Sequence, residues 1–555
     1  MSKDLRINKN NFIDQTTRIS FKFNGKQLFG YKGDTLASAL LANNIHLVGR
    51  SFKYHRPRGI MTCGSEEPNA IVQIGNNSSL TDPNVRATEI ELYEGLEASS
   101  QNCWPSVNFD IGGINNFLSP LLPAGFYYKT FMWPASFWEK YEYFIRHSAG
   151  LGKAPTKSDP DIYDHQYSHC DVLVVGGGIS GIISAKLSAE KGLDTFLIDD
   201  KNFLGGSTIY QENEAYKIND IYSNEWLAKE IKSLKNYPNL IIKNRTSLAA
   251  FHGYNYLLAR ENLTDHLSIS DRKNKIRQRL WKIRAKKVII ASGSIERPLI
   301  FSNNDRPGII LSSSIKKYID YYGVKTGENI SLFTNNDSAY ETAISLNKSG
   351  VKVNVIVDIR KNSESLIVKE ALDLGLKVLW ESTVVETQGY KKIKSFEVMK
   401  LSDDGNNVIG NKTKHNCDCL GISGGWTPMV HLFTQSGGKL KFRNEDNVFI
   451  PDQDKTPPNQ ISVGSCNGEF KLDEIVTRTI ENLKSFLDLS KTCYDEMKIN
   501  CPDEKSKRNI WLLPSDKPIG KTKPFLDFQN DSTAKDVKLA LREGFKSIEH
   551  VKRYT

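Results

Sequence analysis

Three glycines with the spacing G-x-G-x-x-G form the pattern of this chain that points most directly to chemistry. Gly176, Gly178 and Gly181 follow a run of apolar residues and precede a helical pattern. At such a junction the first glycine permits a tight turn, the second lets the backbone approach a pyrophosphate, and the third lets helix and strand pack closely. The N–H groups at the start of the helix then face the phosphates. The pattern therefore predicts a loop that binds the pyrophosphate of a dinucleotide.

An acidic residue at the end of the next predicted strand completes this pattern. Asp199 follows the apolar run 195–198, at about the 20-residue spacing expected for a carboxylate that accepts hydrogen bonds from an adenosine ribose. A carboxylate at this position repels a 2′-phosphate, which disfavours NADP relative to NAD or FAD. The alternative is a glycine-rich turn that binds nothing. The presence of strand, helix and acidic residue together favours the nucleotide site.

A strand–helix–strand unit must position these residues. The sequence predicts a buried strand over 172–175, a helix over 182–191 and a second strand over 195–198. Two later segments, 287–298 and 461–468, have the pattern by which a disulfide-reductase-like flavoprotein leaves its first nucleotide domain and returns to it. The predicted fold class is therefore α/β, with two Rossmann-type domains of the FAD/NAD(P)-binding kind.

A second strand–helix–strand unit, residues 329–360, has lost its glycines. Other residues occupy the three glycine positions: Thr334, Asn336 and Ala339. Side chains at the first two positions block the close backbone approach that a phosphate needs. We expect this second site to be empty and the domain to be kept for its packing. Asp358 and Arg360 leave open the alternative that it still holds a ribose.

The N-terminal part predicts a small ferredoxin-like β-grasp module. Alternating apolar and polar residues around Asn24-Gly25 predict a hairpin, and Gly33-Asp34-Thr35 is a capping sequence for the helix that follows. The loop from Arg50 to Arg58 then interleaves basic and aromatic side chains. It is either a solvated loop or a grip for an anionic group or an acidic partner surface. Residues 106–165 are aromatic and rich in proline, as in a connector that lies over domain surfaces.

Composition excludes several classes of protein. The chain has 555 residues, a formal net charge of +10, 39% hydrophobic residues and 8 cysteines, which is typical of a globular protein of about three domains. Its basic residues are spread along the chain rather than gathered in a stripe, so we expect no nucleic-acid partner. We find no apolar signal segment and no stretch suited to crossing a bilayer, and therefore expect no membrane partner and a cytoplasmic location.

No other catalytic or metal-binding signature in the sequence is complete. In a reducing compartment the cysteines are free thiols, and none forms a C-x-x-C pair suited to zinc or an iron–sulfur cluster. Cys417 and Cys419 lie in an apolar, strand-like context, which favours structural thiols over metal ligands. Gly520-Lys521-Thr522 resembles the end of a P-loop but lacks its first glycine. We therefore predict no metal site and no catalytic residue on this chain.

Several motifs resemble the alpha subunits of heterotetrameric sarcosine oxidases. They lie at residues 50–70, 126–132, 423–428 and 527–531, and the similarity extends from about residue 15 to the end. The resemblance implies a ferredoxin-like domain without a cluster and a Rossmann-type domain that binds NAD non-catalytically. Together with the patterns above, it gives the following predicted boundaries: ferredoxin-like domain 15–105, connector 106–165, NAD-binding domain 166–300 and 421–490, degenerate Rossmann domain 301–420, and linker 491–555.

Carried over residue by residue, the resemblance extends the predicted NAD site beyond the glycines and Asp199. The added residues lie in the turn, after the second strand, after a Gly-Gly pair, and in the returning segment. The complete predicted set is Gly176, Gly178, Ser180, Gly181, Asp199, Asp200, Lys201, Ser207, Leu248, Gly464 and Leu472.

The resemblance also implies partners and further cofactors. A beta subunit would carry FAD, where sarcosine is oxidised, FMN would lie at the alpha–beta interface, and small gamma and delta subunits would complete a heterotetramer. The Arg50–Arg58 loop would then lie near the interfacial flavin phosphate or the beta subunit. The implied reaction converts sarcosine, tetrahydrofolate and oxygen to glycine, 5,10-methylenetetrahydrofolate and hydrogen peroxide.

One departure from the family leaves alternatives open. The chain ends near the point where the family's folate-binding aminomethyltransferase domain begins, so we expect no tetrahydrofolate site on it. Shorter alpha subunits occur in related opine-oxidase, proline-dehydrogenase and hydrogen-cyanide-synthase complexes, but those usually keep clustered cysteines, whereas Cys63 stands alone here. An N-methylglutamate dehydrogenase subunit is a further alternative, because the substrate site lies on another chain. Isolated, the chain would be an inactive nucleotide-binding scaffold.

Overall fold

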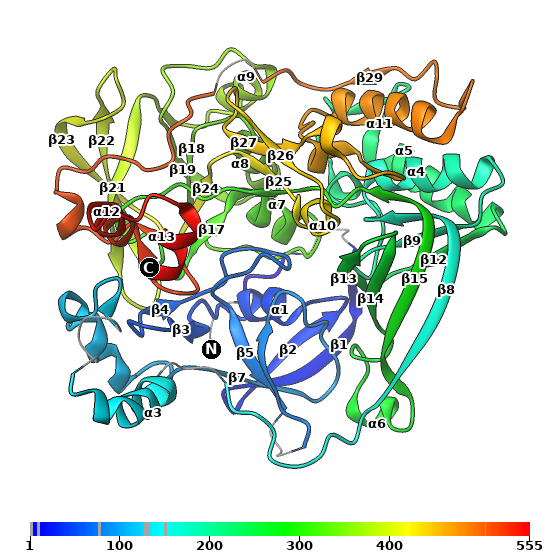
Figure 1. Ribbon diagram of the computed structural model, residues 1–555. Helices are drawn as coiled ribbons and strands as arrows, with labels where there is room; N and C mark the ends of the chain where they lie inside the picture. The colour runs from blue at the N-terminus through cyan, green and yellow to red at the C-terminus, as the bar shows by residue number, and fades with distance from the viewer. Residues whose placement is uncertain (1–3, 8–11, 76–78, 127–132, 149–151, 505–506) are drawn as a thin grey trace.

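An N-terminal β-grasp unit, two Rossmann-type units and a C-terminal helical segment make up the fold (Figure 1). The computed structural model describes residues 4–7, 12–75, 79–126, 133–148, 152–504 and 507–555. The chain leaves the first Rossmann unit after residue 290, builds the second, and returns to the first at residue 460. The predicted α/β fold class is confirmed.

The N-terminal unit is a five-stranded sheet with one helix packed on it. Its elements are β1 (Asp14–Phe23), β2 (Lys26–Lys32), α1 (Leu36–Ala42), β5 (Ile71–Ile74), β6 (Asp82–Arg86) and β7 (Leu96–Ser100). The sheet order is β2-β1-β7-β5-β6, and β1 and β2 form the predicted hairpin. Thr35 begins the helix in a capping box with Ser38, as its sequence indicates. The core of this unit includes Phe21, Leu36 and Leu40, which are fully buried.

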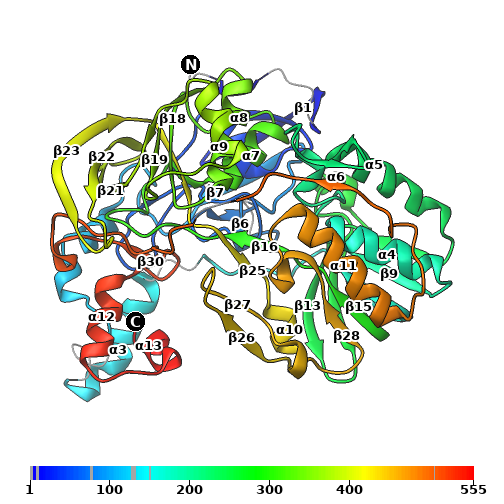
Figure 2. The ribbon, with the colours of Figure 1, turned by 90° about the horizontal axis from the view of Figure 1, so that it is seen from above.

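The first Rossmann unit is a seven-stranded sheet covered by helices on one face (Figure 2). Its elements are β8 (Ile162–Val175), α4 (Ile179–Glu190), β9 (Thr195–Ile198), α5 (Ser223–Ser233), β12 (Leu240–Lys243), β13 (Thr246–His252), β14 (Tyr256–Asn262), β15 (Ile276–Ile290), β28 (Gln460–Ser462) and α11 (Leu472–Leu487). The order is β12-β9-β8-β15-β14-β13, and β28 pairs with β15. Strand β8 starts well before the predicted residue 172 because β15 pairs with it over its whole length. Apolar residues of α4, α5 and α11 share one core under the sheet.

The second Rossmann unit has a parallel five-stranded sheet and an antiparallel three-stranded one. Its elements are β17 (Ile309–Leu311), α7 (Ser312–Asp320), β18 (Asn329–Thr334), α8 (Ser338–Lys348), β19 (Lys352–Asp358), α9 (Leu366–Asp373), β20 (Val378–Leu379), β21 (Ser382–Gly389), β22 (Ile393–Leu401), β23 (Val408–Asn416) and β24 (Cys419–Ser423). The parallel order is β17-β24-β18-β19-β20, so the predicted second strand–helix–strand unit is present. Cys417 and Cys419 are buried in its cores, in agreement with structural thiols.

The C-terminal segment folds against the aromatic connector instead of extending as a linker. It carries β30 (Phe525–Asp527), β31 (Ser532–Thr533), α12 (Ala534–Arg542) and α13 (Ile548–Tyr554). Ala124 packs in a small core with Ala540 and Val551, and Gly125 N–H donates to the Tyr554 carbonyl at 3.0 Å. The connector itself contains α3 (Trp138–Ser148). Residues 127–132 of the aromatic motif lie outside the described residues.

A buried ion cluster corrects both interpretations of the basic loop for two of its arginines, Arg56 and Arg58. The loop is a narrow ladder of β3 (Gly49–Arg50) and β4 (Pro57–Arg58). Arg56 pairs with Asp305 at 2.6 Å, and Arg58 bridges Asp305 and Asp531. Arg56 is 8% exposed and Arg58 1% exposed. These guanidiniums are therefore neither solvated nor available to an outside anion, because acidic residues of the same chain neutralise them.

Electrostatics hold this cluster in its charged form. Burial alone would raise the pKa of Asp305, but the guanidiniums of Arg56 and Arg58 hold it well below its usual range. The backbone N–H groups of Lys53 and Tyr54 both donate to Asp531 at 2.9 Å. The cluster thus joins the N-terminal unit, the start of the second Rossmann unit and the C-terminal segment.

We predict that Asp305→Asn destabilises the protein by about 3–5 kcal/mol, because two buried guanidiniums lose their shared carboxylate. Urea unfolding followed by circular dichroism measures this change. The matched control is Glu481→Gln, whose exposed pair with Arg478 at 3.4 Å contributes about 0.5 kcal/mol or less. An Asp305→Asn protein that unfolds at the wild-type urea concentration would contradict the structural role given to this cluster.

Candidate nucleotide-binding site

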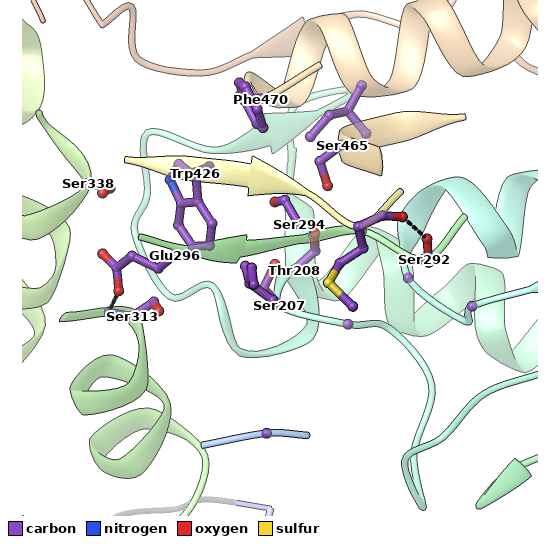
Figure 3. Close-up of a pocket in the computed structure, with 18 of the residues that line it drawn as sticks. Ser207, Thr208, Ser292, Ser294, Glu296, Ser313, Ser338, Trp426, Ser465 and Phe470 are labelled. Carbon is purple, nitrogen blue, oxygen red and sulfur yellow. Dashed lines mark hydrogen bonds between the residues drawn. The ribbon is translucent and has the colours of Figure 1, made fainter. Parts of the chain in front are cut away.

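One large cavity contains the predicted glycine loop. Its volume is about 1300 Å³, and residues of the N-terminal unit and of both Rossmann units line it. The glycine loop after β8 lies on one side, and Ser338 at the start of α8 lies on the other (Figure 3). The cavity is therefore a cleft between the two Rossmann units that the N-terminal unit helps to enclose.

The three glycines of the loop have different structural tasks. Gly176 has a φ of +106°, and a Cβ there would meet the Ala291 carbonyl oxygen at 2.3 Å. A Cβ at Gly181 would lie 1.8 Å from the Gly176 carbonyl oxygen. Gly178, at the N-terminus of α4, has no atom within 4 Å of the position of its missing Cβ. The first and third glycines are thus required by packing, whereas the second leaves open space beside the helix N-terminus that fits a pyrophosphate.

Asp199 lies at the end of β9, next to this loop. Its carboxylate accepts hydrogen bonds from Gly177 N–H at 2.6 Å and from Lys201 N–H at 2.8 Å. Burial and the neighbouring charge of Asp200 raise the pKa of Asp199 to about 6, against the effect of these hydrogen bonds. Asp200 pairs with the Lys201 ammonium at 2.8 Å. The Asp199 carboxylate is fixed by the backbone and lines the cavity where a ribose would accompany a bound pyrophosphate.

The fold brings the other predicted residues to the same place. The predicted residues that line the cavity are Gly176, Gly178, Ser180, Asp199, Asp200, Lys201, Ser207, Leu248 and Leu472. Gly181 and Gly464 lie behind this lining, and a Cβ at Gly464 would meet the Ser180 hydroxyl oxygen at 2.3 Å. The part of these residues in nucleotide binding stays a prediction, and the fold supports it by bringing them together around one cavity.

In the second Rossmann unit, protein groups occupy the corresponding positions. The Asp358 carboxylate is fully buried and accepts hydrogen bonds from the Tyr340 hydroxyl and the Arg360 guanidinium, both at 2.7 Å. Arg360 also pairs with Asp337, at the N-cap of α8, at 2.6 Å. A carboxylate at this helix N-terminus repels a phosphate, and Asp358 is already bonded. The prediction that this second site is empty stays a prediction, and these contacts favour it over a ribose site.

Sequence reasoning missed several residues of the cavity wall. Glu296 and Trp426 lie on β16 (Ser294–Glu296) and β25 (Trp426–Pro428), which pair between the two Rossmann units. Cys63 to Glu66 of the N-terminal unit also line the cavity. Both strands lie in segments that the sequence marks for other reasons, the chain's exit from the first domain and the 423–428 motif. The pairing of these two strands is what brings Glu296 and Trp426 to the cavity, and a single sequence does not show which distant strands pair or in which register.

Comparison with known proteins agrees with this geometry. Residues 170–467 match the family model of the pyridine nucleotide-disulphide oxidoreductases. The chain belongs to this oxidoreductase family. Residues 16–103 match a 2Fe-2S iron-sulfur cluster binding domain, and residues 521–555 match the sarcosine oxidase A3 domain. The family model covers the second Rossmann unit and most of the first, and the A3 match covers the folded C-terminal segment.

Individual relatives confirm the resemblance to sarcosine oxidase alpha subunits. The chain is 38% identical to the sarcosine oxidase subunit alpha of Rhizobium meliloti (strain 1021), over 99% of this chain and 54% of that protein. It is 30% identical to the subunit alpha of Corynebacterium sp. (strain U-96), over 98% of this chain and 52% of that protein. The chain thus spans about half the length of these relatives.

A solved structure shares the fold. The L-proline dehydrogenase from P. horikoshii superposes with a TM-score of 0.63 at 19% sequence identity, over 100% of this chain and 90% of that one. At this identity the likeness concerns the arrangement of the units alone.

The cysteines do not fit the iron–sulfur cluster that the N-terminal family model implies. A two-iron cluster in a ferredoxin is held by four cysteine thiolates, whereas the matched range 16–103 contains Cys63 and Cys103. Within the described residues there is no group of three or more His, Cys, Asp or Glu side chains placed to hold a metal ion. Over the same residues, no helix is long and apolar enough to cross a membrane.

We predict that dinucleotide affinity rises with pH between 5 and 7. The Asp199 carboxylate, with its pKa of about 6, accepts hydrogen bonds from ribose hydroxyls when ionised, so Kd should fall by up to about tenfold over this range. Calorimetric titration with NAD at pH 5, 6 and 7 measures the change. Asp199→Asn should flatten the profile, whereas Asp403→Asn, at an exposed side chain outside the cavity lining, should keep it. A flat wild-type profile would argue against a ribose contact.

Proposed function

We propose that this chain binds NAD non-catalytically as the alpha subunit, or a part of it, of a heteromeric sarcosine oxidase. The observation that carries the proposal is the open space at Gly178, at the N-terminus of α4, in the same cavity that Asp199 lines. A pyrophosphate in that space would meet the helix N–H groups, and the adjoining ribose would meet Asp199. The similarity to sarcosine oxidase alpha subunits over nearly the whole chain supports the choice of complex.

The charges near the loop favour NAD over NADP. Asp199 and Asp200 stand together after β9, and a 2′-phosphate placed there would face their carboxylates. The Lys201 ammonium is not free to counter the charge of these two carboxylates, because it is already bonded to Asp200. FAD shares the adenosine and pyrophosphate of NAD, so this end of the cavity accepts either. The proposal of NAD rests on the resemblance to the alpha subunits.

The proposal extends to partners and to the whole reaction. A beta subunit would carry FAD, FMN would lie at its interface with this chain, and small gamma and delta subunits would complete the assembly. The complex would oxidise sarcosine with oxygen in the presence of tetrahydrofolate, giving glycine, hydrogen peroxide and 5,10-methylenetetrahydrofolate. This chain would hold NAD and form part of the interface, while the amine is oxidised on the partner.

We predict that the purified chain releases NAD on denaturation and that Gly178→Ala releases at least about tenfold less. A methyl group at Gly178 contacts no protein atom, so the fold should stay intact while the pyrophosphate loses its close approach. Mass spectrometry of the released nucleotide, with circular dichroism of the protein, measures both effects. Gly113→Ala, also with nothing within 4 Å, is the matched control and should keep its nucleotide. Release of FAD in place of NAD would refute the NAD assignment.

We predict that the chain produces peroxide from sarcosine only together with its flavin-bearing partner. Co-expression, co-purification and an assay of peroxide with sarcosine, N-methylglutamate and proline test the complex and its substrate. The chain alone serves as the control and should be inactive. Activity with proline or N-methylglutamate but not with sarcosine would assign the chain to a related amine dehydrogenase complex.

A further inference from the structure

Two side chains face the cavity from a short ladder between the Rossmann units. Glu296 of β16 and Trp426 of β25 are direct partners in the antiparallel register. Residues opposite each other in such a pair project to the same face, and so does Ser294, two positions before Glu296. All three line the cavity, and Figure 3 shows Glu296 and Trp426 side by side with Ser294 further along the ladder. The ladder thus presents a carboxyl group and an indole ring together.

The Glu296 carboxyl group is buried, and no cation among the described residues forms an ion pair with it. It is 5% exposed, and its Oε2 atom accepts a hydrogen bond from the Ser313 N–H at 2.7 Å. No described residue forms a hydrogen bond with its Oε1 atom. Burial raises the pKa of Glu296 to about 7, and the hydroxyl groups of Ser423 and Ser313 offset only part of this effect. Leaving a buried carboxyl oxygen unbonded is costly, which indicates that a ligand group completes this site.

We propose that Glu296 and Trp426 form a site for a planar cationic ring, namely the oxidised nicotinamide of a dinucleotide held at the glycine loop. This inference rests on the proposed function and specifies the other end of the same ligand. An indole face attracts a cation through its ring quadrupole, and an adjacent carboxylate attracts it directly. The Oε1 atom, which is shielded in the free chain, supplies the acceptor that the carboxamide N–H of nicotinamide requires once the carboxyl group turns toward the bound ring.

The two ends of the site are linked by one short stretch of chain. Ala291 N–H donates to the Val175 carbonyl at 2.8 Å, just before the glycine loop, and a Cβ at Gly176 would touch Ala291. Glu296 follows five positions after Ala291, so its Cα lies within about 18 Å of Ala291 Cα along an extended chain. Ser207 and Thr208, on the segment that follows Gly205 and Gly206, lie between these ends in the cavity wall (Figure 3). A dinucleotide extended along this wall would place its second ring at the ladder.

This arrangement selects the oxidised ring over the reduced one. Nicotinamide is positively charged in NAD and neutral in NADH, whereas the adenosine and pyrophosphate are the same in both. The attraction of the ring's positive charge to Glu296 and to the face of Trp426 therefore acts on the oxidised form alone, whereas the carboxamide hydrogen bond is open to both forms. ADP-ribose lacks the ring altogether and reports only the contacts at the glycine loop and Asp199.

The test compares three ligands in the full chain freed of nucleotide, by calorimetry at pH 8, where Glu296 is mostly ionised. We expect wild-type protein to bind NAD about tenfold more tightly than either NADH or ADP-ribose. Glu296→Gln and Trp426→Leu should each reduce this preference to about threefold or less and leave ADP-ribose affinity unchanged. Glu481→Gln is the matched control, because Glu481 is an exposed carboxylate on α11 outside the cavity lining. It should behave like wild type.

The outcomes separate this inference from the proposed function. Equal wild-type affinities for NAD, NADH and ADP-ribose would overturn the ring site and leave nucleotide binding at the glycine loop intact, and this comparison needs no variant to fold. A Glu296→Gln protein that keeps the wild-type preference would also overturn it. If the wild-type chain binds none of the three ligands, the proposed NAD function fails, and the ring site fails with it.

Discussion

The buried bonds of Arg58 to Asp305 and Asp531 are the interaction on which the arrangement of the units depends. They join the N-terminal unit to the start of the second Rossmann unit and to the C-terminal segment. Buried charges are tolerated only when they are paired, so these three parts must meet in one geometry before all four charged groups of the cluster are satisfied. The interaction therefore fixes how the three parts are placed more than it adds stability. The position of the cleft wall depends on this placement.

The cleft combines contributions that no single unit could supply. The glycine loop and Asp199 belong to the first Rossmann unit, Ser338 to the second, and Cys63 to Glu66 to the N-terminal unit. The N-terminal unit is also tied to the first Rossmann unit by Arg245, whose guanidinium binds Glu91 at 2.8 Å. A module with the fold of a ferredoxin and too few cysteines for a cluster thus has a structural place in the wall of a nucleotide cleft.

Local patterns were predictable from the sequence, and distant pairings were not. The glycine loop, the hairpin at Asn24-Gly25 and both strand–helix–strand units depend on neighbouring residues, and the structure contains them as expected. The basic loop was misjudged because the partners of Arg58 lie 247 and 473 positions away. The C-terminal segment was expected as a linker because its apolar residues are covered by Ala124 and its neighbours, far away in sequence. Which charged groups pair, and which apolar faces pack together, is decided in the folded chain and cannot be read from neighbouring residues.

The three glycine positions show how a Rossmann unit can keep its shape without the glycines of a phosphate-binding loop. At the third position, where the first unit has Gly181, the second unit carries Ala339, a small side chain that is fully buried. At the middle position, which in the first unit opens to the cavity, it carries Asn336, whose amide bonds to Ser423. The first and third positions also carry side chains in the second unit, Thr334 and Ala339, so its turn folds without the close contacts that require glycine at Gly176 and Gly181. The glycine requirement thus belongs to the phosphate-binding turn rather than to the strand–helix–strand fold itself.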